Sequence, residues 1–331
     1  MASESHKGFA IAMKAPPFLV NFSLLEEYLQ ALPSELCDIY RDEIRNLIQQ
    51  NLPPVVSKRC LATLFGFSAK FIGTLSIRTE RYYRIFQIKK GKKTRTIQAP
   101  RVALKVIQKW FGHHLANSLT FHESVFGFVR GRSTVQGAAI HCSAKWIYSV
   151  DIKDFFPSTP LDSVITALIN VGYKRPGATL IAKLCCYNGN LSQGSPASPI
   201  LSNLIFRPVD EELYQLSKRY NIRYTRYADD IVFSGMDSFP SNIKGEISSV
   251  VQSKGWALSS EKEYYAASPN RLKVYGLLVH GQKPRLTKGY RNRIRAFKHL
   301  LEKNRIPHKN LSRVKGHLAY AQSIEALDNS T

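Results

Sequence analysis

Ile-Arg-Tyr-Thr-Arg-Tyr-Ala-Asp-Asp-Ile-Val-Phe-Ser-Gly, residues 222–235, is the most informative segment of this 331-residue chain. Aromatic and β-branched residues stand on both sides of Asp229 and Asp230, so the segment predicts a β-hairpin with the two aspartates at its tip. Adjacent aspartates are also common in tight turns. The pair alone therefore leaves a simple turn and a functional site equally open.

A third aspartate, Asp151, lies near the end of a second predicted strand, Ile147–Ile152. If this strand lies beside the hairpin in one sheet, three carboxylates come together and repel each other unless cations lie between them. Hard oxygen ligands favour magnesium or manganese. Two such ions can lower the pKa of an attacking hydroxyl and stabilise a leaving pyrophosphate, so the trio indicates nucleotidyl transfer.

The net charge points to a polyanionic partner. The chain carries 47 Lys and Arg against 24 Asp and Glu, a formal charge of +23. The excess lies in residues 70–109, with twelve basic and one acidic residue, and in residues 271–318, with fourteen basic and one acidic. Such blocks exceed what a solvated surface needs and predict phosphate contact. RNA, DNA or an anionic membrane surface would each satisfy the charge.

Several protein classes are excluded by composition. No window approaches 18 uninterrupted apolar residues and the N-terminus lacks a secretory signal, so we expect a cytoplasmic protein without a membrane span. The apolar fraction of 44% is too high for a mainly disordered chain. Five cysteines without a Cys-x-x-Cys pair predict buried free thiols, with no disulfide framework and no zinc site.

The remaining elements are predicted from hydrophobic spacing. Residues 1–60 are expected to be helical, and Ser57–Leu75 predicts two short helices around Gly66, either a packed hairpin or a helix-turn-helix. Tyr83–Ile88 and Arg95–Ile97 predict a hairpin with a basic turn, followed by a helix over 102–119. Apolar residues recur at helical spacing over 290–301, and a second helix is expected over 312–326.

These segments resemble the reverse transcriptases, whose motifs they match in order. Tyr227–Asp230 is similar to the Tyr-x-Asp-Asp signature, and Val150–Phe156 to the first palm strand. Leu191–Pro199 resembles the Gln-Gly-x-Pro-x-Ser-Pro segment of the nucleotide pocket. Gly255–Lys262 is similar to the palm motif that carries a lysine. Two fingers motifs are matched by Phe126–Ser133 and by Arg95–Pro100. The resemblance spans about residues 80 to 300.

The resemblance implies an α+β fold of the right-hand polymerase type. Fingers and a helical thumb accompany a palm, which is an antiparallel sheet with helices on one face. The chain would divide into an N-terminal helical segment (1–75), fingers (76–145), a palm with fingers elements (146–270), and the palm end with a basic thumb (271–331).

The resemblance also assigns the catalytic residues. Asp151, Asp229 and Asp230 would be the catalytic and metal-binding residues, with Asp151 and Asp229 holding two magnesium ions, or manganese, and Asp230 supporting them. Phe156 would be the aromatic gate that excludes a 2′-hydroxyl. A phenylalanine of the core is the alternative interpretation of Phe156.

Further residues would bind nucleotide and nucleic acid. Gln193 would contact the incoming dNTP, Arg95 its phosphates, and Lys262 could protonate the pyrophosphate. Simple binding of the nucleic-acid backbone is an alternative role for Arg95 and Lys262. The residues predicted to bind nucleic acid are Lys92, Lys93, Arg291, Arg295 and Lys298.

Within the family, the chain most resembles the compact retron enzymes of bacteria. It shows no sequence for an RNase H, integrase, maturase or endonuclease domain after the thumb, and its Cys185–Tyr187 segment is similar to theirs. Two sequence motifs typical of retron enzymes are each matched at only some of their positions. Gly137–His141 stands where Asn-Ala-x-x-His is typical, and Val274-Tyr275-Gly276 where Val-Thr-Gly is typical. His141 is equally interpretable as a core or cap histidine.

The retron resemblance implies a partner RNA and a product. A cognate noncoding RNA would serve as primer and template, giving a branched RNA-linked single-stranded DNA (msDNA), in antiphage defence with an effector protein. The nearly neutral residues 1–60 are a candidate effector contact. The alternatives are a group II-like or abortive-infection reverse transcriptase without retron RNA, and a non-catalytic RNA-binding scaffold.

Overall fold

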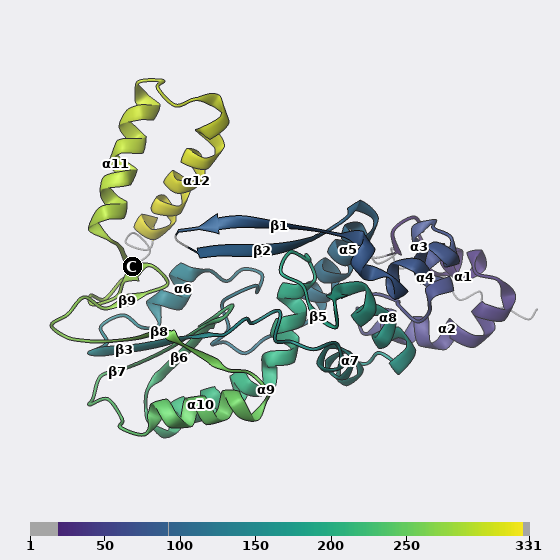
Figure 1. Cartoon of the computed structure of the whole chain (residues 1–331), viewed down its shortest axis with the longest axis horizontal. Helices are drawn as coiled ribbons and strands as arrows, with labels where there is room; N and C mark the ends of the chain where they lie inside the picture. Colours follow the sequence, from purple (N-terminus) through teal and green to yellow (C-terminus); the bar gives the residue numbers. More distant parts are fainter. Residues whose placement is uncertain (1–18, 92, 327–331) are drawn as a thin grey trace, which may run out of the picture. The chain divides into compact units, whose positions relative to one another are not determined.

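A computed structural model describes residues 19–91 and 93–326, which form two compact units (Figure 1). The first unit comprises the chain up to Thr120 together with Phe156–Ile205, and the second comprises Phe121–Phe155 with the chain from Phe206 onward. Each unit is therefore built from two separate stretches of sequence. The four-part division into fingers, palm and thumb stays a prediction.

The first unit is mainly helical. Ser57 and Ser68 begin two of its helices, because their hydroxyls accept hydrogen bonds from the amides of Cys60 (3.2 Å) and Phe71 (3.1 Å). Gly66 ends the first of these two helices at a φ of +67°, where glycine is favoured. Its helices are α1 (Leu25–Ala31), α2 (Ser34–Gln49), α3 (Lys58–Phe65), α4 (Ala69–Ile77), α5 (Val102–Ser118), α7 (Leu161–Asn170), α8 (Arg175–Cys185) and the start of α9 (Ser198–Arg219), with the 3-10 turn η2 (Thr79–Tyr82).

The first unit also contains a long hairpin. Strands β1 (Tyr83–Lys90) and β2 (Lys93–Pro100) pair antiparallel over their whole length, so the hairpin is longer than the sequence predicted. The predicted binding residue Lys92 is outside the described residues. A short pair, β4 (Cys186–Tyr187) and β5 (Asn190–Leu191), precedes the Gln193 segment.

The second unit is organised by a four-stranded antiparallel sheet in the order β6-β7-β3-β8. The hairpin predicted from residues 222–235 is β6 (Arg223–Tyr227) and β7 (Asp230–Gly235). The other two strands are β3 (Trp146–Ile152) and β8 (Leu258–Ala267). β3 is central and almost wholly buried, as its apolar sequence requires.

The two faces of this sheet carry different elements, because side chains alternate along each strand. Tyr224 and Arg226 contact α9, and Tyr148 lies beneath the ammonium group of Lys244 on α10 (Ile243–Ser253). Figure 1 shows α9 and α10 along this side of the sheet. The other face packs against α6 (Thr134–Ala139) and a small sheet of β9 (Lys273–Val274), β10 (Leu277–Leu278) and β11 (Arg285–Leu286).

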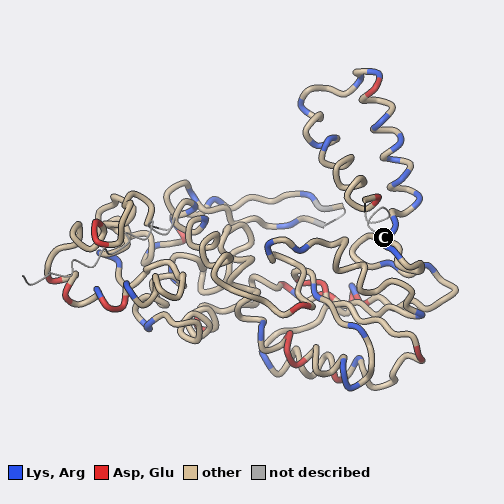
Figure 2. The backbone as a smooth tube through the Cα atoms, turned by 180° about the vertical axis from the view of Figure 1, so that it is seen from behind, with Lys and Arg blue, Asp and Glu red and all other residues tan. Residues whose placement is uncertain are grey.

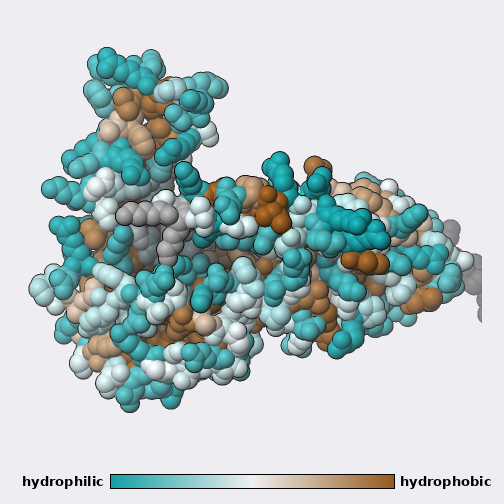
Figure 3. Space-filling model, in the orientation of Figure 1, coloured by the Kyte–Doolittle hydropathy of each residue, from teal (hydrophilic) through white to brown (hydrophobic). Residues whose placement is uncertain are grey.

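Two antiparallel helices close the second unit, α11 (Lys288–Glu302) and α12 (His308–Glu325). Ile294, Phe297 and Leu318 belong to the apolar cluster between them and the small sheet. Lys and Arg recur along both helices (Figure 2), and apolar residues gather between the helices while hydrophilic residues cover their outer sides (Figure 3). This is the amphipathic pattern predicted for a basic helical pair.

Two expectations on sequence class can be compared with the described residues. All five cysteines are free and buried, as predicted. Within residues 19–91 and 93–326, no single helix has the length and apolarity to cross a membrane; only α3 and α4 taken together pass that test, and they are bent by 117°.

Candidate active site

The hairpin β6–β7 and strand β3 bring the backbones of the three predicted catalytic residues together. Asp151 pairs directly with Asp230 in the β3–β7 register, and the amide of Ile152 donates to the carbonyl of Asp229 (2.9 Å). Directly paired residues lie on one face of a sheet, so Asp151 and Asp230 share a face. Asp229 occupies the two-residue turn with Ala228, whose φ is +57°.

The carboxylate of Asp151 is held by a lysine. Nζ of Lys262 on β8 lies 2.5 Å from Oδ1 of Asp151, an ion pair in which the carboxylate is buried and the lysine about half exposed. Within the described residues, no three His, Cys, Asp or Glu side chains converge as metal ligands. The three aspartates nevertheless supply the hard carboxylate oxygens that magnesium prefers, from adjacent backbone positions, so the donor set fits such an ion.

A buried charge network supports the Ala228–Asp229 turn on the α9 side of the sheet. Arg226 and Asp210 are both almost wholly buried and form a two-point ion pair, with Nε–Oδ1 at 2.7 Å and Nη2–Oδ2 at 2.6 Å. Burial disfavours the charged guanidinium, but the carboxylate of Asp210 outweighs it and raises the pKa of Arg226. The hydroxyl of Tyr224 also donates to Asp210 (2.8 Å).

Arg226 connects this network to the Ala228–Asp229 turn. Its Nη1 donates to the carbonyl oxygen of Ala228 (2.8 Å), the residue before Asp229. Its guanidinium also lies 4.7 Å from the ring centre of Phe206 on α9. The side chain therefore fixes the strand that leads to the turn and the turn backbone itself.

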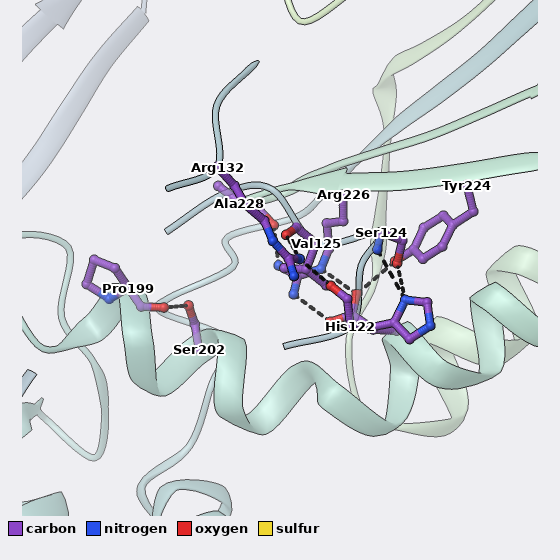
Figure 4. Close-up of polar contacts among 10 residues, drawn as sticks. His122, Ser124, Val125, Arg132, Pro199, Ser202, Tyr224, Arg226 and Ala228 are labelled. Carbon is purple, nitrogen blue, oxygen red and sulfur yellow. Dashed lines mark hydrogen bonds and ion pairs between the residues drawn. The ribbon is translucent and has the colours of Figure 1, made fainter. Parts of the chain in front are cut away.

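The segment His122–Gly127 packs against the same turn (Figure 4). The amide of Arg226 donates to the carbonyl of Ser124, and the amide of Phe126 donates back to the carbonyl of Arg226 (both 2.8 Å). A β-carbon on Gly127 would lie 2.1 Å from the nitrogen of Ala228, so only glycine fits there. The guanidinium of Arg132 donates to the carbonyl of Val125 (2.6 Å) and holds this segment in place.

A neutral network occupies the opposite side of the sheet. His141 is wholly buried, with Nε2 2.7 Å from Oγ1 of Thr225 and Nδ1 2.7 Å from Oγ of Ser234. Burial, followed by the charge of Arg223, lowers the pKa of His141 to about 3, so the ring is neutral. Thr225 also bonds the hydroxyl of Tyr275 (2.8 Å). His141 is therefore a core histidine with both ring nitrogens bonded, which does not decide whether it is also a retron marker.

Two of the predicted nucleotide-binding residues meet in the first unit. In the amide orientation that satisfies both groups, Gln193 accepts from Nε of Arg95 (3.2 Å) and donates to the carbonyl of Thr96 (3.3 Å). The backbones of Gln193 and Gln98 also bond each other (2.9 Å). A β-carbon on Gly194 would lie 2.5 Å from the carbonyl oxygen of Gln98, so glycine allows this close approach.

The two neighbouring phenylalanines after β3 have different environments. Phe155 is buried, and its ring packs edge-on against Phe206 (5.6 Å between centres). Phe156 is only partly buried. The core position is therefore filled by Phe155, and the gate role of Phe156 stays a prediction.

The predicted nucleic-acid-binding residues of the thumb lie on one face of α11. Arg291, Arg295 and Lys298 are exposed and spaced four and three residues apart, and the buried Ile294 lies on the adjoining face. Lys93 opens β2 at the end of the basic hairpin.

Sequence reasoning missed the residues that support the Ala228–Asp229 turn. Arg226 is buried together with its neighbours Tyr224 and Thr225 on β6, and Asp210 lies between buried Val209 and Leu213 on α9. A charged residue in an apolar stripe requires a partner of opposite charge, and this signal could have paired them. The role of Gly127 leaves no such signal, because it depends on a turn about 100 residues away.

Comparisons with known proteins identify the family of the chain. The family model described as Reverse transcriptase (RNA-dependent DNA polymerase) matches residues 88–285, more than half of the chain. The chain is 29% identical over 291 residues to the retron Ec86 reverse transcriptase of Escherichia coli, covering 86% of this chain and 88% of that protein. It is 29% identical over 325 residues to the retron Mx65 reverse transcriptase of Myxococcus xanthus, covering 91% and 76%.

The chain therefore belongs to the reverse transcriptase family and is an RNA-directed DNA polymerase with the α+β right-hand polymerase fold. Within that family it is of the retron type, as its curated relatives indicate. Both predictions are confirmed.

A solved structure of telomerase from Candida albicans with a TWJ fragment of telomeric RNA covers 74% of this chain at 10% identity and a TM-score of 0.45. This chain spans 55% of that telomerase chain. A similarity at this level supports no statement about the present molecule.

Proposed function

We propose that this polymerase copies a cognate noncoding RNA into branched RNA-linked single-stranded DNA (msDNA), with Asp151, Asp229 and Asp230 as its catalytic centre. The observation that carries the proposal is the direct pairing of Asp151 with Asp230, beside the bond from Ile152 to Asp229. The retron character of its relatives supports the RNA and the product.

Asp151 and Asp229 would hold two divalent ions, magnesium or manganese, with Asp230 supporting them. When bound, these ions would activate the attacking hydroxyl and stabilise the leaving pyrophosphate. The chain's own residues supply the frame: Arg226 fixes the carbonyl of Ala228, and Gly127 lets a neighbouring segment pack on the turn. Lys262 forms an ion pair with Asp151, and its ammonium group would have to leave that carboxylate before it could protonate pyrophosphate.

Arg95, Gln193 and Phe156 would bind the incoming dNTP. The bond between Arg95 and Gln193 supports a shared role, since it orients the guanidinium and the amide together. The partly exposed ring of Phe156 supports the gate against a ribose 2′-hydroxyl. The exposed face of Arg291, Arg295 and Lys298 supports binding of nucleic-acid phosphates.

Replacing Asp229 and Asp230 together by Ala tests the catalytic assignment. We expect DNA synthesis on an RNA template to be abolished, while RNA binding measured by gel shift stays close to that of the parent chain. Asp237→Ala is the matched control, because it removes an exposed aspartate of the same unit. Undiminished synthesis by the double variant would refute the centre. Synthesis that is absent from the parent chain as well would favour the non-catalytic scaffold.

Sequencing the nucleic acid that copurifies with the chain tests the retron assignment. A short branched RNA–DNA species is expected, and random cellular RNA would favour a group II-like or abortive-infection enzyme. We place the complex in the cytoplasm and in antiphage defence with an effector protein, for which residues 1–60 are the candidate contact. Residues 1–18 of that segment lie outside the described residues.

A further inference from the structure

Tyr275 fills the space beside Gly137 in the second unit. A β-carbon built on Gly137 would lie 3.0 Å from Cε2 of Tyr275, closer than nearly all carbon contacts in proteins. Gly137 is a buried residue of α6, and Tyr275 follows strand β9. The small residue and the large ring are therefore sterically complementary.

These two positions are also where the chain departs from the retron pattern. Gly137 replaces the asparagine of Asn-Ala-x-x-His, and Tyr275 replaces the threonine of Val-Thr-Gly. An asparagine side chain in place of Gly137 would extend into the ring of Tyr275, because its β-carbon alone is already at the limit of contact. A threonine in place of Tyr275 would leave that space open. Tyr275 therefore requires a small residue at position 137, and glycine meets that requirement.

Tyr275 connects this pair to the catalytic hairpin. Its hydroxyl lies 2.8 Å from Oγ1 of Thr225, and Thr225 in turn bonds His141, which follows α6. The ring of Tyr275 lies 5.6 Å from that of Tyr227, the first residue of the Tyr-x-Asp-Asp motif. Consecutive contacts thus lead from Gly137 through Tyr275 to both Thr225 and Tyr227 on β6.

We propose that Gly137 and Tyr275 form one coupled pair that positions β6, and with it Asp229 and Asp230, for DNA synthesis. Tyr275 is a positioning residue, which acts through Thr225 and Tyr227. The inference rests on the proposed catalytic role of the two aspartates, whereas the coupling of the pair itself does not.

A double-mutant cycle on the full chain tests the coupling, with Gly137→Asn, Tyr275→Thr and the double variant. We expect Gly137→Asn to lower Tm and to reduce kcat for DNA synthesis roughly tenfold, and the double variant to recover part of both losses. Gly137→Asn also approaches Phe126, but that contact is the same in both backgrounds and cancels in the cycle. Gly245→Asn on α10 is the matched control, since nothing lies within 4 Å of a β-carbon there.

Tyr275→Phe separates positioning from packing, because it keeps the ring and removes only the bond to Thr225. At an assay temperature well below Tm, we expect kcat to fall about fivefold and KM for dNTP to stay unchanged. Additive losses in the cycle would overturn the coupling. Coupling in Tm without coupling in kcat, or an unchanged kcat for Tyr275→Phe, would overturn the positioning role. The Tm cycle does not depend on the aspartates, so failure of their assignment is recognised separately.

Discussion

The two sides of strand β6 carry buried polar networks of opposite kinds. Toward α9, Arg226 and Asp210 form a charged pair with almost no solvent exposure. Toward α6, His141, Thr225 and Tyr275 form a chain of neutral groups. A charged pair is costly to bury and is tolerated only when both partners are present, whereas a neutral chain costs less to bury and less to break. Breaking the charged network on the α9 side should therefore cost more free energy of unfolding than breaking the neutral network on the α6 side.

Asp210→Ala is expected to have the largest effect, because it leaves the guanidinium of Arg226 buried without its carboxylate. We expect a loss of about 3–5 kcal/mol in the free energy of unfolding, measured by urea denaturation. The double variant Asp210→Leu/Arg226→Met should recover much of this loss, since no buried charge remains. DNA synthesis should stay low in the double variant, because methionine cannot donate to the carbonyl of Ala228. Full activity there would contradict the positioning of the turn by Arg226.

Thr225→Val tests the neutral side with a substitution of nearly the same shape. The change leaves Nε2 of His141 and the hydroxyl of Tyr275 without their shared partner. We expect a loss of about 2–3 kcal/mol in the free energy of unfolding, less than for Asp210→Ala. A loss larger than that of Asp210→Ala would reverse the comparison between the two sides.

Acidification should weaken the neutral side in particular. The pKa of His141 is lowered from 6.5 to about 3 in the folded chain, so between these values the unfolded chain binds a proton that the folded chain does not. Stability must therefore fall as the pH decreases through this window. Between pH 7 and pH 5 the contribution of His141 is roughly 2 kcal/mol. His141→Gln should lose less stability than the parent chain over this interval, and equal losses would refute the neutral buried ring.

An exposed ion pair should give the smallest effect and sets the scale for the others. Arg45 and Glu26 lie 3.1 Å apart with side chains 42% and 61% exposed. Arg45→Ala should change the free energy of unfolding by less than about 1 kcal/mol, and the change should shrink in high salt. A change as large as that of Thr225→Val would show that burial is not what separates these networks.

The sequence predicted the elements of the site better than their supports. The hairpin around Asp229 was readable, because aromatic and β-branched residues alternate on both sides of a tight turn. The strand with Asp151 was readable for the same reason. Their pairing rested on the family resemblance, since nothing local in a sequence specifies which strands become neighbours.

The supports depend on contacts between distant residues, and this is why they escaped prediction. Gly127 faces Ala228, and Gly137 faces Tyr275. Glycine carries no hydropathy signal of its own, so its fit against a distant residue cannot be read locally. The partly matched retron motifs appeared as two separate departures in the sequence, and only the fold shows that they are in contact.

The order of the strands in the sheet has a consequence for folding during translation. β3 lies inside the sheet between β7 and β8, yet it is made first: it ends at Ile152, while β7 and β8 begin at Asp230 and Leu258. β3 cannot pair with β7 and β8 until both have been translated, and Asp151 cannot pair with Asp230 before then. β3 thus remains unpaired during part of translation, and an unpaired apolar segment is the kind of species that nascent-chain chaperones bind.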